Sequence, residues 1–209
     1  MTAGGLEQAG RERDLDRLLT FVDAIVAIAI TLLVLPLVDL TADITADDRV
    51  GHVLHEHASD LWSFALSFYV IARIWMGQHE VVGPLVVGSG RVTALLLVWS
   101  FTVVVQPFST SLVARAGEQP ITKTLYVGSM ALSLVLVGLL RVEITRHPEL
   151  TDAPQRRGAV GAFTAAGVLV VALVVMLTFP GSSYYPILLL LLEGPVFRLA
   201  QRVRNRHST

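Results

Sequence analysis

A single carboxylate stands inside a long apolar run near the start of the chain. Asp23 lies in the segment 18–38, LLTFVDAIVAIAITLLVLPLV, about one and a half turns from its N-terminal end. A charged side chain inside a membrane span is costly, so it faces protein or water and has partners. Three candidate partners lie in the segment 60–82: Arg73, Trp75 and His79. At 1.5 Å per residue, an antiparallel pair of helices brings Asp23 to about the depth of the last two. We predict a polar cluster in which Asp23 accepts hydrogen bonds from one or more of them.

This predicted polar cluster has two interpretations. As a structural clamp it fixes how the first helix packs, at about 0.6 kcal/mol per hydrogen bond on average in membranes. As a proton relay it serves a pump or a coupled transporter. The span offers no second acid to which Asp23 could pass a proton, which favours the clamp.

The same segment carries a regular apolar stripe. Ala24, Ile28, Thr31 and Leu35 follow the i, i+4, i+7, i+11 pattern of one helix face. Around an axis shared by several copies, this stripe forms stacked rings of the kind that a narrow pore with a dewetting constriction requires. On periodicity alone, such a stripe is typical of a packing face.

Motifs of catalysis and metal binding are missing from the sequence. The run HVLHEH over residues 52–57 lacks the ligand spacing of a known metal site, so we expect no metal. No HExxH, GxSxG or paired acids support an enzyme. The chain has no cysteine, which excludes disulfides, Fe–S clusters and thiolate zinc sites. We expect neither an enzyme nor a resident cofactor.

The composition is that of an integral membrane protein. Of 209 residues, 53% are hydrophobic and 16% charged, against about 45–50% and about 25% in soluble domains. The apolar residues gather in stretches of about 20, enough for a helix to cross the bilayer. We predict an all-α fold with six spans: 18–38, 60–82, 92–114, 122–141, 159–179 and 184–201. The net charge of −1 gives no reason to expect nucleic acid as a partner.

The basic residues orient these spans. With the N-terminus in the cytoplasm, twelve basic residues fall on the cytoplasmic side: Arg11, Arg13, Arg17, Arg91, Arg141, Arg146, Arg156, Arg157, Arg198, Arg202, Arg204 and Arg206. Three fall outside, namely Arg49, Arg115 and Lys123. The excess predicts that both termini are cytoplasmic. We therefore expect a cytoplasmic segment 1–17, a membrane domain 18–201 and a basic tail 202–209.

The first segment resembles a known signature. Arg17, Phe21 and Asp23 resemble the R-x-x-x-F-S-D motif of the endosomal and lysosomal potassium channel family and its prokaryotic relatives. The AIAITLLVL run that follows also resembles the first helix of that family. Val22 stands where the family has Ser, which removes one hydroxyl from the predicted polar cluster. Weaker matches are Trp75 and His79 in a W-x-x-H-H-like stretch, and a Pro-Phe pair at 107–108.

The resemblance implies a homotetramer whose first helices line a central pore. Ile28 would be the hydrophobic constriction, Thr31 a hydroxyl ring above it and Leu35 an outer apolar ring, with Ala24 on the same stripe. The sequence has no TVGYG-like stretch, so selection must come from partial dehydration of the ion. Because potassium gives up water more readily than sodium, this implies a channel selective for potassium. We expect the channel to lie in the plasma membrane of a bacterium.

A second function remains open, namely a proton- or ion-coupled secondary transporter that uses Asp23 and His79. Transporters often show inverted repeats and broken helices near the midplane. No convincing repeat relates 18–114 to 122–201, which favours the channel.

Overall fold

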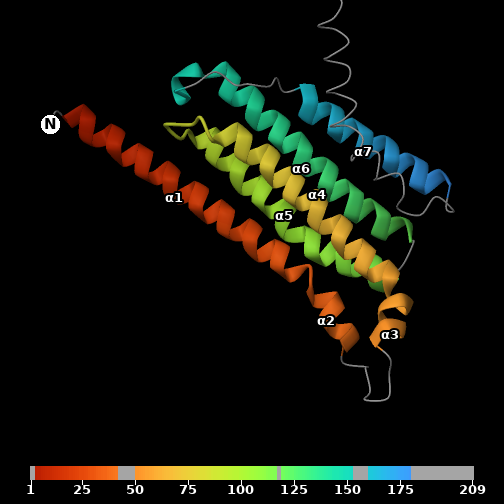
Figure 1. Ribbon diagram of the computed structural model, residues 1–209. Helices are drawn as coiled ribbons and strands as arrows, with labels where there is room; N and C mark the ends of the chain where they lie inside the picture. The colour runs from red at the N-terminus through yellow and green to blue at the C-terminus, as the bar shows by residue number, and fades with distance from the viewer. Residues whose placement is uncertain (1–2, 42–49, 117–118, 153–159, 180–209) are drawn as a thin grey trace, which may run out of the picture.

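The computed structural model describes residues 3–41, 50–116, 119–152 and 160–179, and these are almost entirely helical. The long helices of the bundle run side by side, and α1 lies along one flank of it (Figure 1). The elements are α1 (Ala3–Leu32), α2 (Leu35–Thr41), α3 (Val50–Glu56), α4 (Ala58–Val82), α5 (Gly90–Ala116), α6 (Pro120–Arg146), the short 3₁₀ helix η1 (Pro148–Leu150) and α7 (Val160–Thr178). The all-α prediction is confirmed for these residues.

The first predicted span is not one uninterrupted helix. Helix α1 starts at Ala3 and ends at Leu32, and a turn at residues 33–34 separates it from α2. Pro36 explains the break, because it has no N–H to donate to Leu32 and its ring crowds that carbonyl. The amides of Leu33 and Val34 instead donate to the carbonyls three residues earlier, at 3.3 Å each.

Helix α1 has one buried face and one exposed face. The buried side chains Leu15, Val22, Val26, Ala29 and Leu33 are at most 4% exposed. Their spacing keeps them on one side of the helix, where α1 packs against α5 and, to a lesser extent, α4. Helical packing thus fixes which side of α1 turns away from its own protomer.

Helices α5, α6 and α7 pack in sequence to form the rest of the bundle. Gly138 on α6 permits the close approach of α7, because a Cβ there would lie 2.8 Å from the Phe163 ring. Large side chains fill the interior, and Trp99, Leu96, Met130 and Leu169 are at most 1% exposed.

Four helices in the described part of the chain are long and apolar enough to cross a membrane. They are Ala9–Asp39, Gly90–Val113, Pro120–Arg146 and Gly161–Thr178. The predicted span 60–82 coincides with α4, a 25-residue helix that falls outside this set. It carries Arg73, His79 and Glu80, which lower its hydropathy. The predicted span 184–201 and the tail 202–209 lie outside the described residues.

Candidate functional site

The predicted polar cluster joins α1 to α4. The indole Nε1 of Trp75 donates a 2.9 Å hydrogen bond to Asp23 Oδ1. The His79 ring lies against the Trp75 ring, with centroids 5.5 Å apart and planes tilted by 38°. Within the described residues, neither Arg73 nor His79 hydrogen-bonds Asp23, so of the three candidate donors Trp75 is the one used.

The remaining residues of the N-terminal signature lie on different sides of α1. Arg17 is exposed, and Phe21 is 55% exposed. Val22 is fully buried and belongs to the hydrophobic core. A side chain at this position therefore faces the packed interior, about 100° around the helix from Asp23.

The predicted stripe lies on the exposed face of α1. Ile28 is 59% and Leu35 52% exposed, and Ala24 and Thr31 are exposed as well. At 100° per residue, Ala24, Ile28 and Thr31 lie about 140–200° around α1 from the buried Val26. The stripe is thus available to whatever surrounds the protomer.

Thr31 has its hydroxyl proton engaged. Thr31 Oγ1 donates to the Ile28 carbonyl at 2.8 Å. The oxygen therefore keeps its lone pairs for outside partners and offers acceptors only. Acceptors beside an apolar side chain suit a cation better than an anion.

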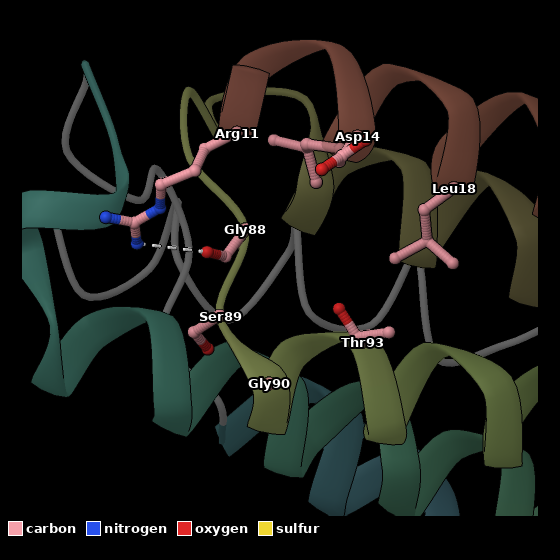
Figure 2. Close-up of a pocket in the computed structure, with 8 residues that line it drawn as sticks. Arg11, Asp14, Leu18, Gly88, Ser89, Gly90 and Thr93 are labelled. Carbon is pink, nitrogen blue, oxygen red and sulfur yellow. Dashed lines mark hydrogen bonds between the residues drawn. The ribbon is translucent and has the colours of Figure 1, made fainter. Parts of the chain in front are cut away.

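The N-terminal part of α1 is attached to the loop between α4 and α5. Figure 2 shows Arg11 reaching this loop, where Arg11 donates to the Gly88 carbonyl at 3.4 Å. Leu15 is buried beside Gly88, and Ser89 Oγ accepts the Val92 amide at the start of α5. A pocket of about 290 Å³ lies at this crossing. Since Arg11 and Ser89 are already engaged, the crossing serves as an attachment point for α1.

The α4–α5 loop is in turn joined to the segment after α6. The Val86 amide donates a hydrogen bond to the Leu150 carbonyl at 2.9 Å, and the Asp152 amide donates one to the Pro84 carbonyl at 3.2 Å. Next to this junction, the pKa of Glu149 lies below its ordinary value because its own backbone amide and then the His147 ring, 2.9 Å away, hydrogen-bond the carboxylate.

A second attachment holds the other end of the stripe. Arg115, near the end of α5, forms an ion pair with Asp39 on α2. Both side chains are more than 60% exposed. This exposed pair joins α2 to the end of α5 beyond the turn at 33–34.

The sequence reasoning missed a polar network inside the bundle. Ser67 Oγ and the Tyr126 hydroxyl are 2.7 Å apart, and Thr110 Oγ1 lies 3.3 Å from Ser67 Oγ. Gln106 Nε2 donates to Ser129 Oγ at 3.1 Å. Polar residues at buried positions of long apolar helices are the available signal, but their pairing depends on how three helices pack.

The predicted absence of a metal site was based on the run at residues 52–57. The closest contacts there are His52 to Glu56 at 3.8 Å and His57 to Asp60 at 3.2 Å, both between near neighbours on α3 and α4. No group of three or more His, Cys, Asp or Glu side chains suited to a metal occurs among the residues that the structure describes.

The described residues define a class of protein: a helical one with helices long and apolar enough to cross a membrane and a carboxylate, Asp23, inside the first of them. Residues 17–107, which run from Arg17 through α1, α2, α3 and α4 into α5, match the family model described as Endosomal/lysosomal potassium channel TMEM175. The matched segment covers just under half of the chain and confirms the family resemblance. No curated protein matches the chain.

Proposed function

We propose that this chain is an ion channel that conducts potassium in preference to sodium through a pore lined by α1. One observation carries the proposal: in the segment that matches a potassium channel family, α1 turns an apolar stripe away from its own protomer. A stripe that the described helices of its own protomer leave exposed is what a helix needs if copies of it are to surround an axis.

The proposed assembly has four copies around a central axis, with six spans per copy and both termini on the cytoplasmic side of the plasma membrane. Closure by rotation repeats each α1 residue as a ring. Ile28 forms the narrowest, apolar ring, Thr31 the hydroxyl ring beside it and Leu35 the outer ring, while Ala24 lies toward the cytoplasm. The residues 184–201 supply the sixth span.

Selection follows from partial dehydration at the Ile28 ring. An apolar ring offers no replacement for the water that an ion leaves behind, so the ion with the lower dehydration cost passes more easily. The Thr31 oxygens, with their protons held by the Ile28 carbonyl, present acceptors to a cation. A small widening of the ring readmits water, so the same ring serves as gate.

The Asp23–Trp75 hydrogen bond supports this geometry as a positioning contact. It lies about 7.5 Å along α1 from Ile28, at five residues of 1.5 Å. By fixing the rotation of α1 against α4, it fixes which side chains face away from the protomer.

Flux measurements in liposomes test the channel. Purified protein in potassium-loaded liposomes is expected to pass potassium faster than sodium without any proton gradient. Flux that requires a proton gradient would overturn the channel in favour of the coupled transporter. Crosslinking in detergent is expected to yield four copies, and a clean monomer would contradict the assembly.

Single cysteines locate the pore, because the natural chain has none. Ile28→Cys and Thr31→Cys are expected to react with a water-soluble cationic thiol reagent and lose flux. Val171→Cys on α7 is the matched control, since Val171 is 60% exposed in the protomer against 59% for Ile28. Equal loss of flux for Ile28→Cys and Val171→Cys, or no reaction at Ile28→Cys, would refute the pore assignment.

A further inference from the structure

Three buried polar groups carried by α5 and α6 have no hydrogen-bond partner among the described residues. They are the indole Nε1 of Trp99, the side-chain oxygen Oε1 of Gln106 and the hydroxyl of Ser133. All three residues are at most 2% exposed. Lipid tails offer no hydrogen-bond partner to a polar group in a bundle that crosses a membrane. Each of these buried groups therefore needs a hydrogen-bond partner inside the protein.

The assignment of the Gln106 oxygen as the free atom follows from its neighbours. Ser129 Oγ donates its own proton to the Tyr126 carbonyl at 3.0 Å, so it can only accept from Gln106. Gln106 must therefore present its Nε2 to Ser129, at 3.1 Å, and its Oε1 elsewhere. The unpaired atom is an acceptor.

Ser133 also differs from the other buried hydroxyls. Ser100, Ser109 and Thr110 on α5 each donate to the carbonyl four residues earlier, at 2.8–2.9 Å. Ser133 makes no such bond within the described residues. Its hydroxyl is thus available to a partner that is not its own helix.

The three groups lie at neighbouring depths on facing helix surfaces. The hydrogen bond between Gln106 and Ser129 sets the register of α5 against α6, which run antiparallel. Both other groups lie on the side of this level that faces the N-terminal end of α1. At 1.5 Å per residue along the helix axes, Ser133 is about 6 Å from Ser129 and Trp99 about 10 Å from Gln106. Trp99 and Gln106 are seven residues apart and share one face of α5, as Ser129 and Ser133 share one face of α6.

Pro107 interrupts the backbone hydrogen bonds of α5 next to Gln106. Because proline has no N–H, the Val103 carbonyl loses its ordinary helical donor. Val103 lies between Trp99 and Gln106 on α5 and is 2% exposed. The three unpaired groups are thus a donor at Trp99, an acceptor at Gln106 and a Ser133 hydroxyl that can serve as either.

We propose that the interface of α5 and α6 binds water, held by Trp99 Nε1, Ser133 Oγ and Gln106 Oε1. A cation would leave the Trp99 N–H unpaired, and an anion would leave the Gln106 oxygen unpaired. Water both donates and accepts, so it alone satisfies this mixture. Two water molecules, each with hydrogen bonds of about 2.8 Å, span the roughly 10 Å from Gln106 through Ser133 to Trp99.

The test uses the indole proton of Trp99 as the reporter. The chain has three tryptophans, so ¹⁵N-indole labelling in lipid nanodiscs gives three resonances. Trp62→Phe and Trp75→Phe identify two of them and leave Trp99 by elimination. We expect a direct dipolar cross-peak between the Trp99 indole proton and water despite its 1% exposure. Absence of that cross-peak in the unmodified protein overturns the proposal, whatever the variants do.

A matched pair of variants tests the role of Ser133. Ser133→Thr keeps a hydroxyl, whereas Ser133→Val has the same shape without one. We expect the cross-peak to persist in Ser133→Thr and to fall by more than half in Ser133→Val. Equal cross-peaks in the two variants would remove Ser133 from the site. Ser100→Ala, next to Trp99 with its hydroxyl already bound to Leu96, is expected to leave the signal unchanged.

Discussion

Replacing Trp75 by phenylalanine removes the indole N–H that reaches Asp23 and keeps an aromatic ring against His79. Hydrogen bonds to charged groups contribute about 1.5–3 kcal/mol in soluble proteins. Pairs inside membranes average about 0.6 kcal/mol and reach about 1.7. Asp23 is only partly buried, so the value lies in the lower range. We expect Trp75→Phe to lower the free energy of unfolding by about 1 kcal/mol, or roughly fivefold in the equilibrium constant.

A double-mutant cycle separates this hydrogen bond from the loss of packing. Equilibrium unfolding in mixed micelles is measured for Trp75→Phe, Asp23→Ala and the double variant, and a coupling of about 1 kcal/mol is expected. Trp62→Phe on the same helix is the control, because Trp62 is 56% exposed and its change should stay within about 0.5 kcal/mol. A coupling below about 0.3 kcal/mol, the scatter of independent sites, would refute the positioning role of the pair.

Three further changes probe other contacts. Leu33→Ala should lower the free energy of unfolding by about 2 kcal/mol or more, since Leu33 is 1% exposed. Leu32→Ala is the control and should cost far less, because Leu32 is 42% exposed. Equal shifts of the melting temperature would contradict the assigned faces of α1. Arg115→Gln removes the exposed ion pair with Asp39 and should change the free energy of unfolding by less than about 1 kcal/mol. High salt screens the pair, so the variant and the unmodified protein should then have the same stability. A stability difference that persists in high salt would show that the pair is not its cause. Because the pKa of Glu149 is lowered in the folded protein, its carboxylate contributes to stability above the ordinary pKa of 4.5, and this contribution is lost as pH falls through the lower folded value. Glu149→Gln should remove this pH-dependent loss of stability, measured as unfolding midpoints at neutral and acid pH. An unchanged pH profile would contradict the assignment.

The partnership of Asp23 with the second long segment could be predicted from sequence because two constraints meet there. A carboxylate in an apolar span needs a partner, and the rise per residue limits partners to a narrow depth. The choice of Trp75 over Arg73 and His79 could not be predicted, since it depends on the rotation of α4 about its axis. Helix periodicity grouped Ala24, Ile28, Thr31 and Leu35 on one face, but whether that face packs inside the protomer or turns outward required the structure.

Other features were missed because hydropathy says little about backbone or tertiary contacts. Pro36 signals a break, but proline is tolerated in many membrane helices, so its effect at residues 33–34 required the structure. The N-terminal residues that extend α1 back to Ala3 mix good helix formers with the poor ones Gly4, Gly5 and Gly10, and their polarity places them outside any apolar window. The attachments of Arg11 to Gly88 and Arg115 to Asp39 join residues more than 70 positions apart, and no local pattern predicts them.

The neighbouring residues Val22 and Asp23 show how the orientation of α1 is fixed twice. Val22 is fully buried in the core, so the valine that stands in place of serine acts on packing, while the hydrogen bond from Trp75 uses the next side chain around the helix. A rotation of α1 by one residue, about 100°, would expose Val22 and carry Asp23 away from Trp75. Both losses oppose the same rotation, one through packing and one through a polar contact. Among the residues that the structure describes, no hydrogen bond or ion pair joins the exposed stripe of Ala24, Ile28, Thr31 and Leu35 to another helix, so the stripe can meet ions or neighbouring copies without weakening the packing of α1 on the bundle.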